Sequence, residues 1–164
     1  MIDCGALGRR AIAACLAALI VAGCGPGSGT AGRQPAITAA TIGDQTLLDV
    51  AEYLSSAPYI DADPDRGRSL YLQCRACHAI EPGGPNLAGP SLHGIFGRPA
   101  GAVADFPYSR VLEQADFVWT PRTMDSWITN PYLFLPGNRM SYAGMRRPED
   151  RRDLIAWMLR EAGR

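Results

Sequence analysis

Cys74, Cys77 and His78 belong to the segment Cys-Arg-Ala-Cys-His, whose residue types and spacing carry the most specific chemistry in this sequence. C-x-x-C-H is the attachment signature of c-type haem. On one helical turn, two thiols three residues apart can reach the two vinyl groups at one edge of a porphyrin, and the adjacent imidazole can turn onto the iron. We therefore predict one covalently attached haem c, with His78 as an iron ligand.

Two other uses of paired cysteines fit this sequence less well. A redox-active C-x-x-C belongs near a βαβ pattern, and a zinc site needs two further cysteine or histidine ligands. The other histidine, His93, is expected to be a loop or surface residue, and the remaining cysteines, Cys4, Cys15 and Cys24, lie near the N-terminus. The cysteines show no pattern typical of a disulfide framework.

A second iron ligand is expected because an electron carrier needs its iron held on both faces, and methionine often has this role in cytochromes c. Met124 and Met158 fall in helical patterns and are predicted to be core residues. Met140 lies in residues 135–144, a proline- and glycine-rich stretch that frees its sulfur from helix packing. We predict Met140 as the ligand, with Met145 as the alternative.

The stretch from about Gly67 to Arg160 resembles the class I cytochrome c family, which includes mitochondrial cytochrome c and bacterial cytochrome c2. The matching stretches are residues 89–98, Phe106 with Tyr108, Trp119, Asn130-Pro131, residues 136–144 and residues 153–157. The resemblance implies an all-α class I cytochrome c fold, with few helices and with loops wrapped around one haem. It also implies an electron carrier and not an enzyme.

The resemblance further implies roles for single residues around the haem. The carbonyl of Pro90 should accept a hydrogen bond from Nδ1–H of His78, which orients the imidazole. Arg98, Tyr108 and Trp119 should meet the haem propionates; a solvated charge for Arg98 and a core aromatic for Trp119 are the alternatives.

The resemblance also implies packing contacts elsewhere in the domain. Gly67 and Tyr71 on the first long helix should pack against Trp157 on the last, and Tyr142 should cover the haem edge near the methionine ligand. Mitochondrial members of the family surround the exposed haem edge with lysines, whereas residues 132–135 of this chain are apolar. Partner capture should therefore depend more on apolar contact than on charge.

Proline and capping residues predict the helix starts. Residues 63–64 are expected to begin a helix that runs into the haem motif, residues 120–129 to form a second helix, and Pro148 to begin the last. Between His78 and Tyr108, the density of glycine and proline predicts loops.

The N-terminus has the features of an export signal. Two arginines precede the apolar run of residues 11–22, which is too short to span a bilayer. The end of this run, up to Cys24, resembles the cleavage box of bacterial lipoproteins, so Cys24 is predicted to carry lipid; ordinary cleavage is the alternative. More than one acyl chain gives stable anchoring.

These signals divide the chain into a lipoprotein-type signal peptide at 1–23, a tether at 24–57 and a cytochrome c domain at 58–164. Apolar residues recur at helical spacing within residues 44–56, which form either a short helix lying on the domain or a stiffer part of the tether.

The function expected from these features is single-electron transfer at the periplasmic side of a bacterial membrane, by a lipid-anchored or otherwise soluble periplasmic monomer. The partners would be proteins: a membrane donor such as a quinol-oxidising complex, and an oxidase, reductase or reaction centre as acceptor. The formal net charge of zero argues against nucleic acid. The alternatives are a haem-based sensor or peroxidase-like protein with a displaceable Met140, and a fixed cytochrome subunit of a larger redox complex.

Overall fold

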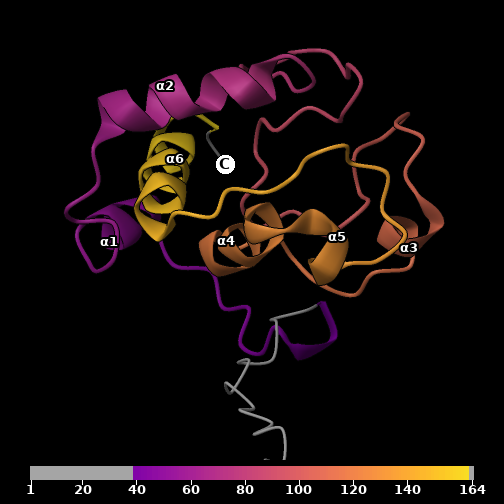
Figure 1. The fold of residues 1–164 in the computed structure, drawn as a ribbon, viewed down its shortest axis with the longest axis horizontal. Coiled ribbons are helices and arrows are strands. Elements are labelled where there is room, and N and C mark those ends of the chain that lie inside the picture. Colours follow the sequence, from indigo (N-terminus) through magenta and orange to yellow (C-terminus); the bar gives the residue numbers. More distant parts are fainter. Residues whose placement is uncertain (1–38, 163–164) are drawn as a thin grey trace, which may run out of the picture. The chain divides into compact units, whose positions relative to one another are not determined.

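The computed structural model describes residues 39–162, and this part of the chain is all-helical, with two isolated β-bridges and no β-sheet. Figure 1 shows how its helices are arranged. In chain order they are η1 (Ala39–Thr41), α1 (Val50–Leu54), α2 (Pro64–Arg75), α3 (Arg110–Glu113), α4 (Pro121–Thr129), α5 (Pro131–Phe134) and α6 (Pro148–Glu161). The all-α fold expected from the sequence is confirmed.

Proline begins α2, α4 and α6 at the positions that the sequence predicts. It fits there because the first N–H groups of a helix have no partner within the helix. The side chain of Asp63 caps α2 by accepting from the N–H groups of Asp65 and Arg66, both at 3.0 Å. The hydroxyl of Thr120 caps α4 by accepting from the N–H of Thr123 at 3.0 Å. Local signals therefore determine where α2 starts, and the haem motif lies at the C-terminal end of this helix.

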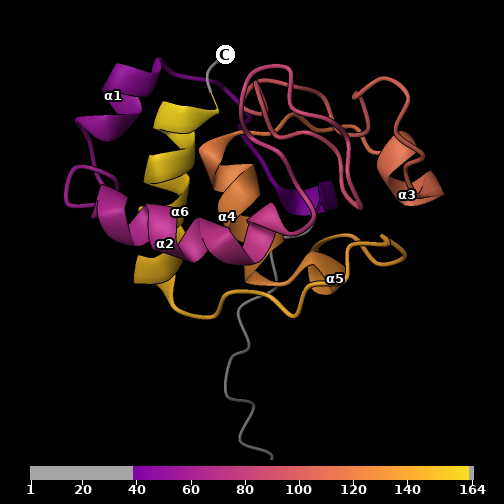
Figure 2. The same cartoon turned by 90° about the horizontal axis from the view of Figure 1, so that it is seen from above.

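Helix α2 crosses α6 at close range, and a glycine makes the contact possible (Figures 1 and 2). A Cβ on Gly67 would lie 2.2 Å from the carbonyl oxygen of Asp153 and 2.6 Å from Cβ of Trp157, so a larger residue would force the helices apart. The rings of Tyr71 and Trp157 pack with their centroids 4.7 Å apart. The predicted packing of Gly67 and Tyr71 against Trp157 is therefore present.

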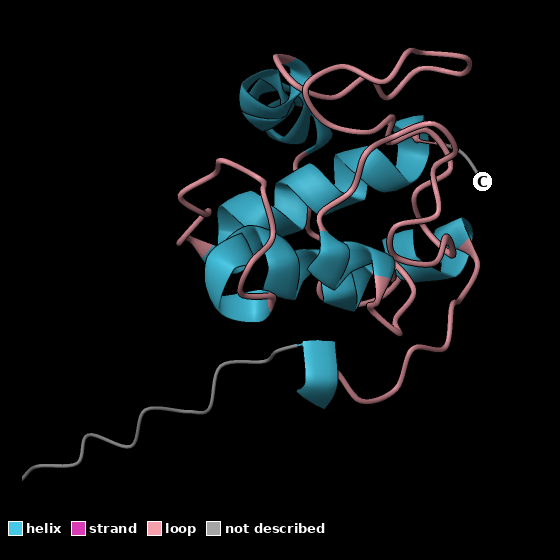
Figure 3. Cartoon of the chain, turned by 90° about the vertical axis from the view of Figure 1, so that its right-hand side faces the viewer, coloured by secondary structure: helices cyan, strands magenta, loops and turns pink. Residues whose placement is uncertain are grey.

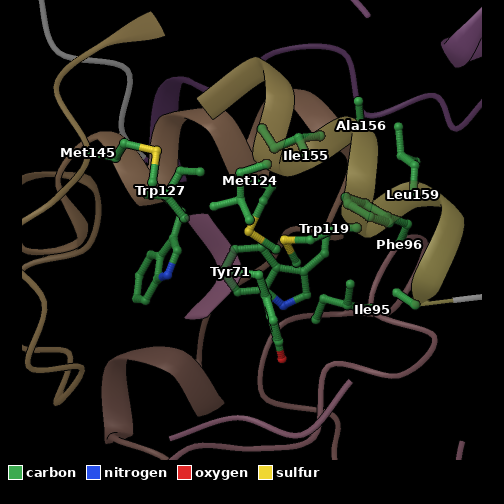
Figure 4. Packing of buried hydrophobic residues seen from close by; sticks show 14 of the residues in the cluster. Tyr71, Ile95, Phe96, Trp119, Met124, Trp127, Met145, Ile155, Ala156 and Leu159 are labelled. Carbon is green, nitrogen blue, oxygen red and sulfur yellow. The ribbon is translucent and has the colours of Figure 1, made fainter. Parts of the chain in front are cut away.

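A cluster of aromatic rings lies within the hydrophobic core, and Figure 4 labels two of its members, Trp119 and Trp127. Neighbouring rings meet edge to face, with centroids 4.9 to 5.8 Å apart, which is a favourable arrangement for aromatic side chains. We call this set the aromatic cluster: Phe117, Trp119, Trp127 and Phe134. Met124 and Met158 are buried in the same core, as the sequence predicts.

Loops make up the chain from the end of α2 to the start of α3, as predicted (Figure 3). One short pairing organises part of them. The N–H of Gly97 donates to the carbonyl of Trp119 at 2.8 Å, and the N–H of Trp119 donates to the carbonyl of Arg98 at 2.9 Å. This pairing brings Arg98 and Trp119, two of the predicted haem contacts, next to each other.

Residues 42–59, which we call the N-terminal belt, pack on the same core as the long helices. Ile42 is only 3% exposed and Tyr59 is also buried. Helix α1 lies within this belt and contacts α6. Of the two possibilities that the sequence leaves open, the structure therefore shows a short helix lying on the domain.

Two further contacts join the N-terminal belt to the loops beside the aromatic cluster. The side-chain oxygen of Gln45 accepts from the N–H of Val118 at 2.6 Å. Leu47 packs on Gly97, where an added Cβ would lie 2.9 Å from the side chain of Leu47. The belt therefore touches the segment that carries Trp119.

The predicted signal peptide and the predicted lipidation site, Cys24, lie outside the described residues. Among residues 39–162, no helix has the length and apolar character needed to cross a membrane.

Candidate haem-binding site

The attachment motif lies at the C-terminal end of α2. The N–H groups of Cys77 and His78 both donate to the carbonyl of Cys74 at 3.0 Å, so the motif continues α2 as a turn. Cys74 is half-buried, Cys77 is exposed, and both are free thiols. Burial, together with the charge of Cys77, raises the pKa of Cys74 to about 11, which keeps this thiol protonated near neutral pH. The turn presents two unlinked thiols beside an imidazole.

The imidazole of His78 is oriented by the backbone. Its Nδ1 lies 2.7 Å from the carbonyl oxygen of Pro90. Because a carbonyl oxygen can only accept, Nδ1 carries the proton and Nε2 keeps a free lone pair for a metal. Burial lowers the pKa of His78 while the Pro90 carbonyl opposes the shift, so the neutral ligand form is favoured. The bond is the one expected for Pro90.

Gly89 leaves room for this imidazole. A Cβ at Gly89 would lie 2.2 Å from Cε1 of His78 and 2.7 Å from both ring nitrogens. The backbone therefore lies directly against the ring, and a side chain there would displace it. These three features fit a haem that is attached through Cys74 and Cys77 and has His78 as an iron ligand: the thiol pair, the oriented imidazole and the close backbone contact.

Met140 lies in the segment 135–145, which we call the Met loop, and its sulfur accepts a hydrogen bond from Nε1–H of Trp127 at 3.2 Å. Asn138 holds the loop in shape: its amide donates to the carbonyls of Pro131 and Leu135, both at 2.9 Å, and its oxygen accepts from the N–H of Met140 at 2.9 Å. The methionine is thus placed in an irregular loop and held at its sulfur by Trp127 and at its N–H by Asn138.

Met145, the alternative ligand, lies differently. Its side chain is 6% exposed and belongs to the hydrophobic core (Figure 4), and its N–H donates to the carbonyl of Ile128 at 2.7 Å. Met140 is only partly buried. This difference in placement favours Met140 as the ligand.

The Met loop lies beside the end of α2. The hydroxyl of Tyr142 donates to the side-chain oxygen of Gln73 at 3.0 Å, one residue before Cys74. Burial raises the pKa of Tyr142, and the charge of Cys74 adds to this shift. The structure therefore brings the predicted methionine loop and the attachment motif into one region of the molecule.

Arg98 is half-buried, and its hydrogen bonds go to loop carbonyls. Nη1 donates to Ser91 at 2.9 Å, Nε donates to Gly94 at 3.3 Å, and Nη2 donates to His93. Burial lowers the pKa of Arg98, while the nearby phenol of Tyr108 opposes this shift. Carbonyl oxygens do not neutralise the positive charge, so an anionic group near Arg98 would be stabilised.

Tyr108 and Trp119 complete the predicted set. Burial raises the pKa of Tyr108, whereas Arg98 lowers it, so the phenol stays neutral and able to donate near neutral pH. Trp119 is buried in the aromatic cluster, as the alternative interpretation expects, and its backbone pairs with that of Arg98.

Two buried polar atoms within the described part of the chain have no hydrogen-bond partner: Oγ of Ser109 and Nδ1 of His93. Ser109 directly follows Tyr108, one of the expected propionate contacts. Its unpaired hydroxyl could therefore donate a hydrogen bond to a propionate as well. Leaving such a hydroxyl buried and unpaired carries a desolvation cost of about 1–3 kcal/mol. His93 lies in a loop, as expected, but is half-buried.

The sequence interpretation missed Trp127 and Ser109. The only sequence signals were an aromatic residue on a buried helix face and a hydroxyl beside a predicted haem contact, and neither pattern distinguishes a site residue from a core residue.

An all-α domain with this turn of two thiols and an oriented imidazole defines a c-type haem protein. Comparison with known proteins supports this class, because the chain is similar in sequence to cytochromes c and c2. Cytochrome c of Kluyveromyces lactis is 34% identical over 105 residues, which cover 63% of this chain and 96% of the relative. Cytochrome c of Chlamydomonas reinhardtii is 40% identical over 97 residues, 58% of this chain and 87% of the relative. Cytochrome c2 of Agrobacterium tumefaciens is 38% identical over 102 residues, 60% of this chain and 92% of the relative. No family model matches the chain.

The chain belongs to the class I cytochrome c family. It is accordingly a haem cytochrome of the electron-carrying kind, and not an enzyme. Its cofactor is haem c and its partners are redox proteins.

Proposed function

We propose that this chain is an exported mono-haem cytochrome that passes single electrons between membrane-associated partners, with its iron held by His78 and Met140. The observation that carries the proposal is the orientation of His78, whose Nδ1 lies 2.7 Å from the Pro90 carbonyl and whose Nε2 is left free. Haem c supplies a one-electron iron couple. The chain's own residues attach it through thioethers at Cys74 and Cys77 and hold a ligand on each face.

The loop geometry supports an electron carrier over a sensor or peroxidase. Such a protein needs a methionine that leaves the iron readily, whereas Met140 is tied by its neighbours Asn138 and Trp127. Little rearrangement of the ligands between oxidation states favours rapid electron transfer. Arg98, Tyr108, Ser109 and Trp119 are proposed to hold the propionates with charge and hydrogen bonds.

For the partners, we propose a membrane donor such as a quinol-oxidising complex, and an oxidase, reductase or reaction centre as acceptor. Tyr132 and Leu133 on α5 are 67% and 45% exposed, and α5 directly precedes the Met loop. Exposed apolar side chains next to the proposed methionine ligand support docking by apolar contact, through the small interfaces typical of transient redox complexes. We propose a monomer.

For the location, we propose the periplasmic side of a bacterial membrane, with residues 1–23 as a signal peptide, Cys24 as the lipid anchor and the cytochrome domain beyond the tether. An anchor would raise the effective concentration of the carrier near membrane partners. Cys24→Ser should move the protein from the membrane to the soluble periplasmic fraction; an unchanged distribution would contradict the anchor.

The ligands are tested on the full chain, produced in a bacterium with the machinery for c-type haem maturation. We expect covalent haem, low-spin spectra, the weak ferric band of iron–methionine ligation and no change when carbon monoxide is added to the reduced protein. Met140→Ala should abolish the band and admit carbon monoxide, whereas the matched variant Met145→Leu should leave both properties unchanged.

Three results would contradict the proposal. Loss of the band in Met145→Leu, but not in Met140→Ala, would move the ligand to Met145. Ready carbon monoxide binding by the unmodified chain would favour a sensor or peroxidase. Absence of covalent haem would exclude a c-type cytochrome.

A further inference from the structure

The short pairing that carries Arg98 and Trp119 has one open side. Backbone hydrogen bonds of 2.8 to 2.9 Å join residues 97–100 to residues 117–119. In such a pairing, the backbone groups of successive residues point to opposite sides. Those of Trp119 point into the pairing, so the N–H of Val118 points away from it and needs another partner.

The N-terminal belt supplies this partner. The side-chain oxygen of Gln45, which is half-buried, accepts from the N–H of Val118 at 2.6 Å, across 73 positions of the chain. Two residues further along the belt, the side chain of Leu47 lies so close to Gly97 that an added Cβ there would be 2.9 Å away. The belt therefore contacts both segments of the pairing, one by a hydrogen bond and the other by packing.

Gln45 lies in a turn that is itself held in shape. The carboxylate of Asp44 accepts from the N–H of Thr46 at 2.9 Å and from its hydroxyl at 2.7 Å. The hydroxyl of Tyr53 accepts from the N–H of Leu48 at 3.2 Å and donates to the carbonyl of Thr46 at 3.4 Å. The backbone on both sides of Gln45 is thus fixed, so its side chain is presented to the pairing by an ordered turn.

We propose that Gln45 is a positioning residue for the propionate end of the haem: by holding Val118, it keeps Trp119 and Arg98 where they meet the propionates. This inference rests on the propionate contacts proposed above. The positive charge of Arg98 near the haem favours the reduced, less positively charged iron. Water that enters a loosened pairing would screen this charge, so loss of the Gln45 contact should lower the reduction potential.

The experiment uses the full haem-loaded protein. Gln45→Leu removes the acceptor and nearly keeps the side-chain size, and Gln45→Glu is the rescue variant, because a carboxylate oxygen also accepts. The matched control is Val50→Ala, which reduces the packing of the belt at α1 but keeps Gln45. The measurements are amide hydrogen exchange at Val118 and Trp119, the NMR signals of the propionate protons in the ferric protein, the reduction potential and the free energy of unfolding.

In Gln45→Leu, we expect the amides of Val118 and Trp119 to exchange about fivefold faster, the effect of losing one neutral hydrogen bond. The propionate signals should shift and the potential should fall. Gln45→Glu should restore the slow exchange and the propionate signals. Val50→Ala should lower the free energy of unfolding and leave the exchange, the signals and the potential unchanged.

The comparison with Arg98→Leu separates the two levels of the argument. If Arg98→Leu changes the propionate signals and the potential but Gln45→Leu changes neither, the inference is overturned and the proposed propionate contact of Arg98 stands. If Arg98→Leu also changes neither, that contact is overturned and this inference with it. Equal changes in Val50→Ala and Gln45→Leu would assign the effect to the stability of the belt and would overturn the role of Gln45.

Discussion

The two proposed iron ligands are held by different parts of the polypeptide. His78 is oriented by the carbonyl of Pro90 and lies against the backbone of Gly89. Met140 is held by side chains, through the indole of Trp127 and the amide of Asn138. A backbone carbonyl survives every substitution that keeps the chain path, whereas a side-chain donor is removed by one. Sequence change should therefore adjust ligand exchange and potential mainly from the methionine side.

Removing the ligands themselves should give the largest contrast between the two sides. Met140→Ala should keep the covalent haem and the fold and open one face of the iron, whereas His78→Ala should yield little folded, haem-loaded protein because the attachment turn loses its anchor. Haem staining after denaturing electrophoresis and circular dichroism of the same samples measure this. Equal yields of the two variants would contradict the comparison.

On the histidine side, a substitution can act only by displacing the backbone or the ring. Gly89→Ala places a methyl group 2.2 Å from Cε1 of His78, and we expect a loss of about 3 kcal/mol in the free energy of unfolding from the clash and the broken hydrogen bond. Denaturant unfolding of the haem-loaded protein measures it. Gly83→Asn is the control, since a Cβ there meets open space and asparagine tolerates its φ of +71°. A loss of similar size in the control would contradict this account.

On the methionine side, Asn138→Ala removes three hydrogen bonds that shape the loop, and about 2 kcal/mol of stability should be lost. Imidazole should also bind the ferric protein more tightly. Asn86→Ala is the matched variant beside His78, where Asn86 accepts from the N–H of Ser91 at 3.0 Å. It should lower stability and leave imidazole binding unchanged. Tighter imidazole binding in Asn86→Ala would show that the two sides are not independent.

The smallest effect is expected where the two sides meet. Tyr142→Phe removes the hydrogen bond to Gln73, which connects the Met loop to α2 near the solvent. An exposed neutral bond of this kind contributes about 0.5 kcal/mol. Thermal unfolding should therefore shift by only a few degrees, and the iron–methionine band should remain. Loss of the band would mean that this exposed contact determines the position of the methionine.

Local signals in the sequence predict much of this arrangement. Prolines mark the starts of α2, α4 and α6, and side-chain caps accompany the first two. The C-x-x-C-H turn is contiguous, and proline and glycine mark the Met loop as irregular. The roles of Pro90, Arg98 and Tyr108 follow from family resemblance and not from spacing, because their contacts depend on the path of loops.

Contacts between distant segments could be predicted only where the family resemblance implied them, as for Gly67 and Trp157. The bond from Trp127 to Met140 requires the relative placement of a helix and a loop, and the unpaired hydroxyl of Ser109 is recognised only when its burial is known. The same reason applies to Ile42, which is buried in the core, and to Gln45, whose partner Val118 lies 73 positions along the chain. A free tether and a packed belt have similar composition, so only the structure distinguishes them.

In the anchored protein proposed above, the packing of the N-terminal belt would set how far the domain can move from the membrane. With Cys24 as the proposed anchor, a tether reaching to residue 57 could extend to about 110 Å, whereas one that ends where Ile42 enters the core would extend to about 60 Å at most. The belt would thereby nearly halve the distance over which the carrier can search. A tether of this length would confine its collisions to partners that project from the same membrane surface.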